Sequence, residues 1–337
     1  MENDYSMAIN LLALTPHQVS RDLKGKIVTI YGEPKSGKTT NATKFPKSLL
    51  LAFEKGYNAL PGIMVQPVTK WSEFRQALKD LAKPEVKGLF ETVVIDTADI
   101  AFDACEKYIC TREGVDQIGD IPYGAGYKML KQEFNDALRS IPMMDYGLVN
   151  ISHSVVSTFT DDAGQEYSKT VPTLPKAARH IVLSMSDIIG YAKPVENAEG
   201  ERKVALFLRG TPQFEAGSRF KHTPQVIPFE YDALVNAIAD AIEKEGEEHG
   251  SDAVTDKAQN LYEAPKEATF KELKDSIDTT IGELMANKNE EQQVEIAAKI
   301  KKTVESQLGK GKMLKDTTED QRDHIELILG DLKELLS

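Results

Sequence analysis

The sequence predicts an α/β protein with a mostly parallel β-sheet flanked by helices, antiparallel late strands and a small C-terminal α-helical module. Short continuous apolar runs, typical of buried parallel strands, alternate with helix-length amphipathic stretches over residues 26–244. A glycine-rich loop that ends in a lysine and a threonine follows the first apolar run at residues 32–39. Residues 267–337 show only helical periodicity, so they are expected to form the helical module.

Residues 32–39 fill the pattern G-x-x-x-x-G-K-[ST] without a mismatch. The apolar run 26–31 before them predicts a buried strand, and residues 40–45 after them can begin a helix, which is the context that this loop requires. Glycines let the backbone N–H groups of such a P-loop converge on phosphate oxygens. Lys38 is expected to reach the β- and γ-phosphates, and the Thr39 hydroxyl to ligate Mg²⁺. The predicted nucleotide-binding residues are Gly32, Glu33, Pro34, Lys35, Ser36, Gly37, Lys38, Thr39 and Thr40.

A second motif lies at residues 92–97, where an apolar run closes on Asp96 in the form of a Walker B strand. The carboxyl ends of parallel strands meet at one edge of a sheet, and ligands bind there. Asp96 is therefore expected near Thr39, where both residues take part in holding Mg²⁺. An ordinary strand can also run into a turn in this way, but the P-loop upstream favours the metal-binding interpretation.

Apolar runs and helical periodicity place the other elements of the core. Strands are expected at 48–53, 63–65, 147–153, 186–191 and 203–209, the last two joined as a hairpin across 193–202. Helices are expected at 9–12, 71–82, 98–110, 127–140 and 230–244. The polar segment 154–180 shows few signs of order and is predicted to be a long loop, of the kind that is usually functional or disordered.

The composition changes along the chain and predicts three parts: a core with the P-loop over 1–244, a linker over 245–266 and an acidic helical module over 267–337. Thr269 and Glu272 form a capping box at the start of the first helix of this module, and Gly309 ends its second helix. Apolar stripes on three amphipathic helices predict a small bundle or an oligomerisation module.

The net charge of −12 is unevenly spread along the chain. Residues 241–337 hold 14 Lys and Arg against 23 Asp and Glu, a net of −9, which leaves −3 for residues 1–240. The nearly neutral core can present local basic patches to a polyanion, whereas the acidic end would repel nucleic acid.

Several classes of protein are not indicated. No apolar run is long enough to span a bilayer and the first residues do not resemble a signal peptide, so we expect a cytoplasmic protein without a membrane partner. Cys105 and Cys110 have the spacing of neither a zinc knuckle nor a redox pair. The six histidines are scattered, so no transition-metal site is expected.

The order of these elements over residues 22–230 resembles the RecA-type recombinase ATPase core. More narrowly, the chain resembles the small phage-encoded recombinase-like proteins that act in single-strand annealing. The P-loop marks only the superfamily, and the narrower resemblance depends on four segments at 50–54, 93–97, 126–131 and 149–154. The acidic C-terminal module has no counterpart in this resemblance.

The resemblance implies roles for two further residues at the nucleotide site. In RecA-type proteins a glutamate at the end of the strand after the P-loop polarises the attacking water, and Glu54 occupies the matching place. The strand after Walker B ends in that family in a glutamine that couples the γ-phosphate to the DNA loops. Here His153 stands at that position; it can also donate to phosphate, but the departure leaves the coupling mechanism open. The predicted catalytic residues are Glu54, Lys38 and His153.

By the same resemblance, residues 112–126 and 154–180 match the two DNA-binding loops of the family. In the second loop, Lys169, Lys176 and Arg179 are predicted to neutralise phosphates, and Phe159 or Tyr167 to stack on bases. Recombinase cores also present cations from their late strands to a neighbouring subunit's ATP, and the candidates here are Arg209, Arg219 and Lys221.

The sequence therefore predicts a RecA-like ATPase that uses ATP and Mg²⁺, binds single-stranded DNA and promotes strand annealing or pairing. It is expected to form a filament or ring with ATP at subunit interfaces, and a single-strand-binding protein is a further candidate partner. No guanine-specifying N-K-x-D motif occurs, so ATP is the default nucleotide. One alternative is a small-molecule P-loop enzyme such as a kinase, although the arginine-rich lid it would need is not found. The other is a nucleotide-gated scaffold whose C-terminal helices recruit a partner.

Overall fold

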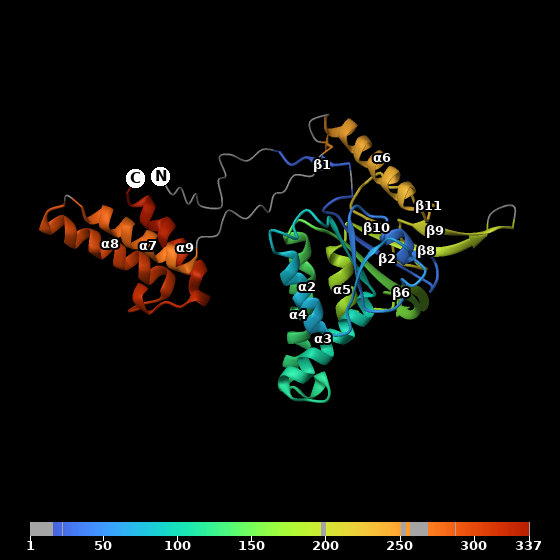
Figure 1. Ribbon diagram of the computed structural model, residues 1–337, viewed down its shortest axis with the longest axis horizontal. Coiled ribbons are helices and arrows are strands. Elements are labelled where there is room, and N and C mark those ends of the chain that lie inside the picture. Colours follow the sequence, from blue (N-terminus) through green and yellow to red (C-terminus); the bar gives the residue numbers. More distant parts are fainter. Residues whose placement is uncertain are drawn as a thin grey trace. The chain divides into compact units, whose positions relative to one another are not determined.

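The computed structural model describes residues 16–21, 23–196, 200–250, 254–256, 269–286 and 288–336. The chain divides into two compact units: one spans residues 16–262, and the other contains residues 263–337. Figure 1 shows a sheet with its helices in the first unit and a helical bundle in the second. The helix predicted at 9–12 lies outside the described residues.

The first unit is built on a ten-stranded sheet with the order β11-β9-β8-β2-β6-β5-β3-β4, in which β10 also pairs with β8 and β7 with β6. The strands from β8 to β4 in this order run parallel, and β7, β9, β10 and β11 pair antiparallel. The predicted α/β fold, with a mostly parallel sheet and antiparallel late strands, is confirmed. The strands are β2 (Ile27–Gly32), β3 (Ser48–Ala52), β4 (Met64–Pro67), β5 (Thr92–Asp96), β6 (Gly147–Thr160), β7 (Glu166–Pro172), β8 (Ile188–Glu196), β9 (Arg202–Phe207), β10 (Gly217–Ser218) and β11 (Val226–Pro228).

Helices cover both faces of the sheet because alternate residues of each buried strand point to opposite sides. Val93 and Ile95 pack on one face, against α2, α3, α4 and α5, whereas Val94 packs on the other face, against α1 and α6. The apolar strands predicted from the sequence are therefore buried on both sides. The helices are α1 (Lys38–Ala42), α2 (Trp71–Leu81), α3 (Ala98–Glu113), α4 (Ala125–Met143), α5 (Lys176–Met185) and α6 (Tyr231–His249), with short 3₁₀ turns at Ile118–Asp120 and Pro122–Gly124.

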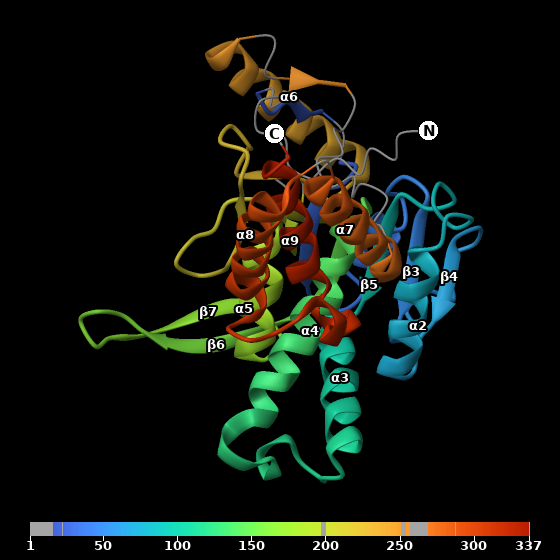
Figure 2. The ribbon, with the colours of Figure 1, turned by 90° about the vertical axis from the view of Figure 1, so that its left-hand side faces the viewer.

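The prediction of a long loop over 154–180 is wrong, because the structure has a β-hairpin and the start of a helix there. Strand β6 continues through Thr160, pairs antiparallel with β7, and is followed by α5. Figure 2 shows the hairpin projecting from the body of its unit. The turn is closed by Asp161, whose carboxylate accepts the N–H groups of Ala163 and Gln165, and by Gly164, whose φ is +80°. Asp161 and Gly164 are typical turn residues, and they lie between two segments rich in β-branched and aromatic residues. This pattern indicates a hairpin, and the sequence analysis missed it.

The end of the first unit also differs from the predicted boundary. Helix α6 runs to His249, so the first residues of the predicted linker 245–266 are helical. Beyond it, β12 (Val254–Thr255) pairs in parallel with β1 (Val19–Ser20) as a separate two-stranded sheet.

The second unit holds three helices in its described part: α7 (Phe270–Met285), α8 (Glu290–Leu308) and α9 (Arg322–Glu334), with 3₁₀ turns at Leu314–Asp316 and Glu319–Gln321. The predicted capping box is present, since Thr269 accepts the N–H of Glu272 at 3.2 Å. Ile277, Ile325 and Leu332 form the centre of a core that belongs to this unit alone. No helix in the described part of either unit is long and apolar enough to cross a membrane.

Candidate nucleotide-binding site

The P-loop connects the carboxyl end of β2 to the start of α1 and needs glycine at two positions. Gly37, which precedes α1, has φ of 84°, a left-handed conformation that glycine adopts readily. At Gly32 a Cβ atom would lie 2.2 Å from the carbonyl oxygen of Ala192 in the neighbouring strand β8. The close approach of β2 to β8 therefore explains Gly32, and the turn into α1 explains Gly37.

Lys38 lies inside the loop with only 5% of its surface exposed. Its ammonium group donates to the carbonyl oxygens of Gly32, at 3.0 Å, and Glu33, at 2.7 Å. Burial lowers the pKa of Lys38, and nearby carboxylates, of which Asp96 has the largest effect, act in the opposite direction. The buried Ser36 hydroxyl has no hydrogen-bond partner among the described residues. A cation and a free donor at a helix start suit a phosphate group.

Asp96 closes β5 and meets Thr39, as the two motifs predicted. The Thr39 hydroxyl donates to Asp96 Oδ2 at 2.7 Å, and Asp96 is 1% exposed. Burial raises the pKa of Asp96, and the Glu54 carboxylate raises it further. The second carboxylate oxygen of Asp96, Oδ1, is buried without a partner in the described part of the chain.

These residues fit a divalent cation. Thr39 and Asp96 supply oxygen atoms, the hard ligands that Mg²⁺ prefers, and the Glu54 carboxylate lies beside them. Gly56 leaves the space in front of them open, because a Cβ there would lie 3.5 Å from Glu54 Oε1, 3.6 Å from Asp96 Oδ2 and 3.7 Å from Thr39 Oγ1. The unpartnered Asp96 oxygen and this small cradle are the observations that favour Mg²⁺.

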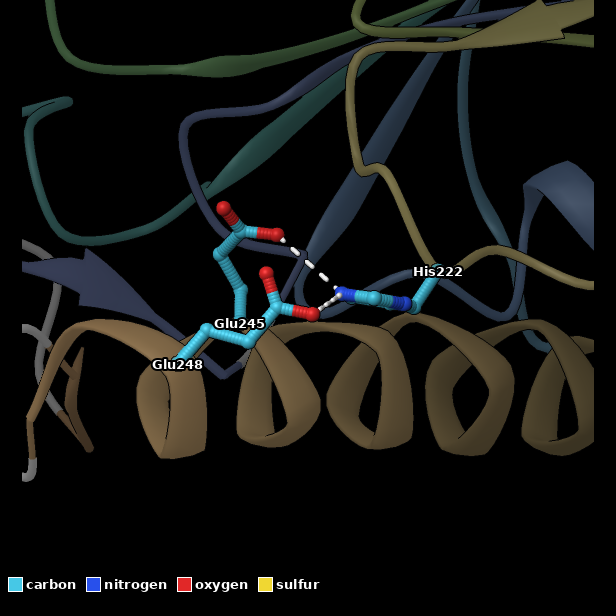
Figure 3. Close-up of side chains that lie close together, drawn as sticks. All are labelled: His222, Glu245 and Glu248. Atoms are coloured by element: carbon cyan, nitrogen blue, oxygen red, sulfur yellow. Dashed lines mark ion pairs between the residues drawn. The ribbon is translucent and has the colours of Figure 1, made fainter.

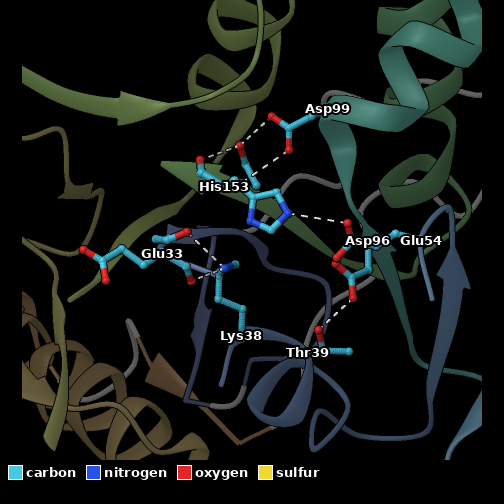
Figure 4. Close-up of polar contacts among 9 residues, drawn as sticks. Glu33, Lys38, Thr39, Glu54, Asp96, Asp99 and His153 are labelled. Atoms are coloured by element: carbon cyan, nitrogen blue, oxygen red, sulfur yellow. Dashed lines mark hydrogen bonds and ion pairs between the residues drawn. The ribbon is translucent and has the colours of Figure 1, made fainter. Parts of the chain in front are cut away.

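Glu54, which follows β3, and His153, within β6, face each other across the site (Figure 4). Glu54 Oε2 lies 3.5 Å from His153 Nε2, and both side chains are about one-third exposed. Sequence reasoning missed Asp99, in the first turn of α3. Its carboxylate accepts the Ser152 hydroxyl at 2.8 Å and the His153 backbone N–H at 3.4 Å. Asp99 therefore holds the part of β6 from which His153 enters the site.

Comparison with known proteins places the chain in a family. A family model described as an AAA domain matches residues 24–220, more than half of the chain. The chain belongs to this AAA domain family. It is also 30% identical over 338 residues to the SPbeta prophage-derived uncharacterized protein YorG of Bacillus subtilis (strain 168), with 98% of this chain and 100% of that protein covered. Among solved structures, the flagellar accessory protein FlaH from Methanocaldococcus jannaschii is similar over 61% of this chain and 85% of that one, with 11% identity and a TM-score of 0.33.

The AAA domain is thus a P-loop ATPase domain in which the two sequence motifs meet at one site. Of the predicted nucleotide-binding residues, Ser36 and Lys38 are buried, Gly37 and Thr39 are half-buried, and Glu33, Pro34, Lys35 and Thr40 have exposed side chains. The sequence assigned no role to Asn41. Its side chain donates to the carbonyls of Gly37 and Phe229 and accepts the N–H of Tyr231, which joins α1 to the start of α6.

The residues that the sequence predicted to contact DNA lie on the β6–β7 hairpin and on α5. Phe159 and Tyr167 are directly opposite each other, with ring centroids 5.9 Å apart. Lys169, two residues along β7, lies 3.6 Å from a Glu215 carboxylate oxygen. Lys176 begins α5, and Arg179 follows one turn later.

The three cations predicted to act on a neighbouring subunit already have partners in the chain. Arg209 donates to the backbone carbonyls of the segment 218–223. Arg219 pairs with Asp187 at 2.9 Å, and Lys221 pairs with Glu248. They hold the loop after β10 in place.

His222 belongs to the same loop and meets two carboxylates of α6 (Figure 3). Its Nε2 lies 3.1 Å from Glu248 and 3.4 Å from Glu245, contacts that become ion pairs when the imidazole is protonated. The ligand atoms of these three residues lie within 4.8 Å of one another, close enough to hold a cation. Glu248 already pairs with Lys221, so we interpret the cluster as a clamp between the loop and α6.

We expect Asp96→Asn to stabilise the nucleotide-free protein while weakening Mg²⁺-dependent nucleotide binding. Because folding raises the pKa of Asp96, the ionised carboxylate destabilises the fold above the folded pKa, and this effect disappears as the pH falls below it. The gain at pH 7 should be roughly 1 to 3 kcal/mol. Thermal unfolding of both proteins between pH 4 and pH 8 measures it, and a difference that does not shrink in acid would contradict the assigned cause.

Proposed function

We propose that this AAA domain protein hydrolyses ATP and acts on single-stranded DNA, promoting strand annealing or pairing. The observation that supports this best is the course of β6. One strand passes through His153 at the nucleotide site and continues without a break into the hairpin that holds Phe159 and Tyr167. A contact with the terminal phosphate could therefore alter the hairpin through a single rigid element.

At the nucleotide site each side chain has a distinct part in the proposed hydrolysis. Lys38 neutralises the β- and γ-phosphates, and Thr39 with Asp96 would hold Mg²⁺, which supplies positive charge against the phosphate oxygens when bound. Glu54 accepts the proton of the attacking water, and His153 donates to the γ-phosphate. Glu54 would thus act on the water and His153 on the phosphate, from side chains that face each other.

The proposal includes assembly into a filament or ring with ATP at subunit interfaces. Arg219 and Lys221 are exposed at the surface, so they remain candidates for contact with a neighbouring nucleotide once their present partners are exchanged. Arg209 is the weaker candidate, because its guanidinium is taken up by several backbone carbonyls.

The test is phosphate release from ATP and Mg²⁺, with and without single-stranded DNA, using Lys38→Ala as the blank. Loss of the Lys38 cation should reduce hydrolysis by at least ~100-fold, since removing one preorganised charge donor costs about that much. We expect single-stranded DNA to stimulate the wild-type protein and to leave the variant unchanged. A wild-type rate that ignores DNA would reject the DNA-directed function.

A nucleotide-gated scaffold is the alternative that this outcome would favour. The C-terminal unit is compact, has its own core, and exposes apolar side chains such as Val294 and Leu327, which could contact a partner. Weak hydrolysis that is indifferent to DNA, together with a partner bound only in the presence of ATP, would support it.

A further inference from the structure

Two adjoining cavities lie between the hairpin, α5 and α4. The larger, of about 730 Å³, is walled by β7, α5 and the segment 210–216. The smaller, of about 330 Å³, lies between α4 and α5. His180 and Ser184 of α5 line both cavities, so the two adjoin along α5, and we call them together the α4–α5 groove.

Basic side chains line the groove from end to end. Of the described residues, one carboxylate lines the larger cavity, that of Glu215, which is paired with Lys169, and none lines the smaller cavity. The basic residues that line the groove are Lys128, Lys131, Arg139, Lys169, Lys176, Arg179 and His180.

Most of this positive charge is not neutralised by ion pairs in the part of the chain that the structure describes. Among the described residues, none of Lys128, Lys131 and Lys176 has a carboxylate within ion-pair distance, and Arg139 donates to the neutral Asn135 side chain. A chain with a net charge of −12 thus holds a row of unpaired cations along one hollow. Scattered surface lysines would instead face solvent singly, so the arrangement indicates a polyanionic ligand.

The spacing of the basic residues along α4 and α5 is that of side chains on one face of each helix. On α4, Lys128, Lys131 and Arg139 recur three and eight residues apart and share one helix face. On α5, Lys176 and His180 are four residues apart and line the same groove from the other side. Helix α4 therefore presents its cations to the smaller cavity, α5 presents Lys176 and Arg179 to the larger one, and His180 lies where the two adjoin.

We propose that the α4–α5 groove binds the sugar–phosphate backbone of single-stranded nucleic acid, as a continuation of the hairpin surface. Side chains alternate across a strand, so Phe159, Tyr167 and Lys169 share one face of the hairpin. Lys169 also lines the groove. Aromatic rings stack readily on unpaired bases, and a basic groove beside them can follow the backbone of a single strand. This inference rests on the proposed function and assigns its DNA path.

The groove is connected to the nucleotide site through β2. Tyr31, the residue before Gly32, donates its hydroxyl to the carbonyls of Thr170, which follows Lys169 in β7, and of Glu215, which lines the larger cavity. The N–H of Thr173, just after β7, donates to the His153 carbonyl at 3.0 Å. Strand β7 and the residue after it are thus hydrogen-bonded to β2, just before the P-loop, and to β6 at His153.

The test uses the full-length protein and a fluorescent single-stranded oligonucleotide, with a variant that removes three cations from α4: Lys128→Gln, Lys131→Gln and Arg139→Gln. The matched control removes three exposed lysines outside the groove: Lys79→Gln, Lys87→Gln and Lys107→Gln. We expect the groove variant to bind at least ~10-fold more weakly at 150 mM salt. Its log–log salt slope should fall by about 2, since each single-strand phosphate contact contributes ~0.7. The control should bind like the wild type.

Phosphate release, measured with and without DNA, separates the two proposals. The altered side chains do not contact the nucleotide site, so hydrolysis without DNA should persist in the groove variant. If the groove variant binds single strands as tightly as the wild type while DNA still stimulates hydrolysis, the groove is rejected and the proposed function stands. If binding depends on the groove but DNA does not stimulate hydrolysis, the proposed function fails and the groove stands. Tighter binding to a duplex of the same length would overturn the single-strand assignment.

Discussion

Glu54→Gln is expected to reduce ATP hydrolysis by about 10²- to 10⁴-fold, the usual contribution of a positioned general base. The amide keeps the size and the contact with His153 but cannot accept a proton from water at neutral pH. Lys38, Thr39 and Asp96 are unchanged, so ATP with Mg²⁺ should bind with near wild-type affinity. The variant should therefore separate binding from turnover.

Single-turnover hydrolysis and equilibrium binding of ATP, measured on the same preparations, provide this separation. Glu33→Gln is the matched control, because Glu33 has an exposed side chain and contacts Lys38 only through its backbone carbonyl. Wild-type turnover in Glu54→Gln would show that Glu54 is not the base. Asp99 would then be the next carboxylate to test, since burial raises its pKa and it accepts the hydroxyl of Ser152, the residue before His153.

The sequence predicted most of the nucleotide site because its parts are local. The P-loop needs only a strand, a glycine loop and a helix start in succession, and Asp96 needs only the end of an apolar run. Asp99 was missed because its partners Ser152 and His153 are far away in the sequence, and meet it only where α3 packs beside β6. No local pattern separates Asp99 from an ordinary acidic residue in the first turn of a helix.

The hairpin was missed for a different reason. Its polar, exposed half resembles a loop in composition, and only the alternation of side chains along a strand and the turn at Asp161 indicate pairing. The α4–α5 groove could not be predicted at all, because it requires Lys131 and His180 to face the same hollow, although each alone resembles a solvated surface residue. Strands predicted from apolar runs were reliable, since burial on both faces leaves a continuous signal.

Gly32→Ala is expected to lower the free energy of unfolding by about 3 kcal/mol or more, the upper range for overpacking a rigid site. The new Cβ would lie 2.2 Å from a backbone carbonyl oxygen of Ala192, and a backbone atom cannot rotate away. Gly32 is also the last residue of β2, paired with His153 on one side and Ala192 on the other. Relief of the clash would separate two central strands where the P-loop begins.

The midpoint of thermal unfolding should therefore fall by roughly 6 to 12 °C in the nucleotide-free protein, at the usual 2 to 4 °C for each kcal/mol. Gly217→Ala is the control, because Gly217 lies in strand β10 of the same sheet and a Cβ there would meet no atom within 4 Å. Its midpoint should stay within about 1 °C of the wild type, which corresponds to a surface substitution. Equal midpoints for Gly32→Ala and the wild type would mean that β2 and β8 can separate freely. The Gly32 carbonyl, which accepts a hydrogen bond from Lys38, would in that case not be held in place by the sheet.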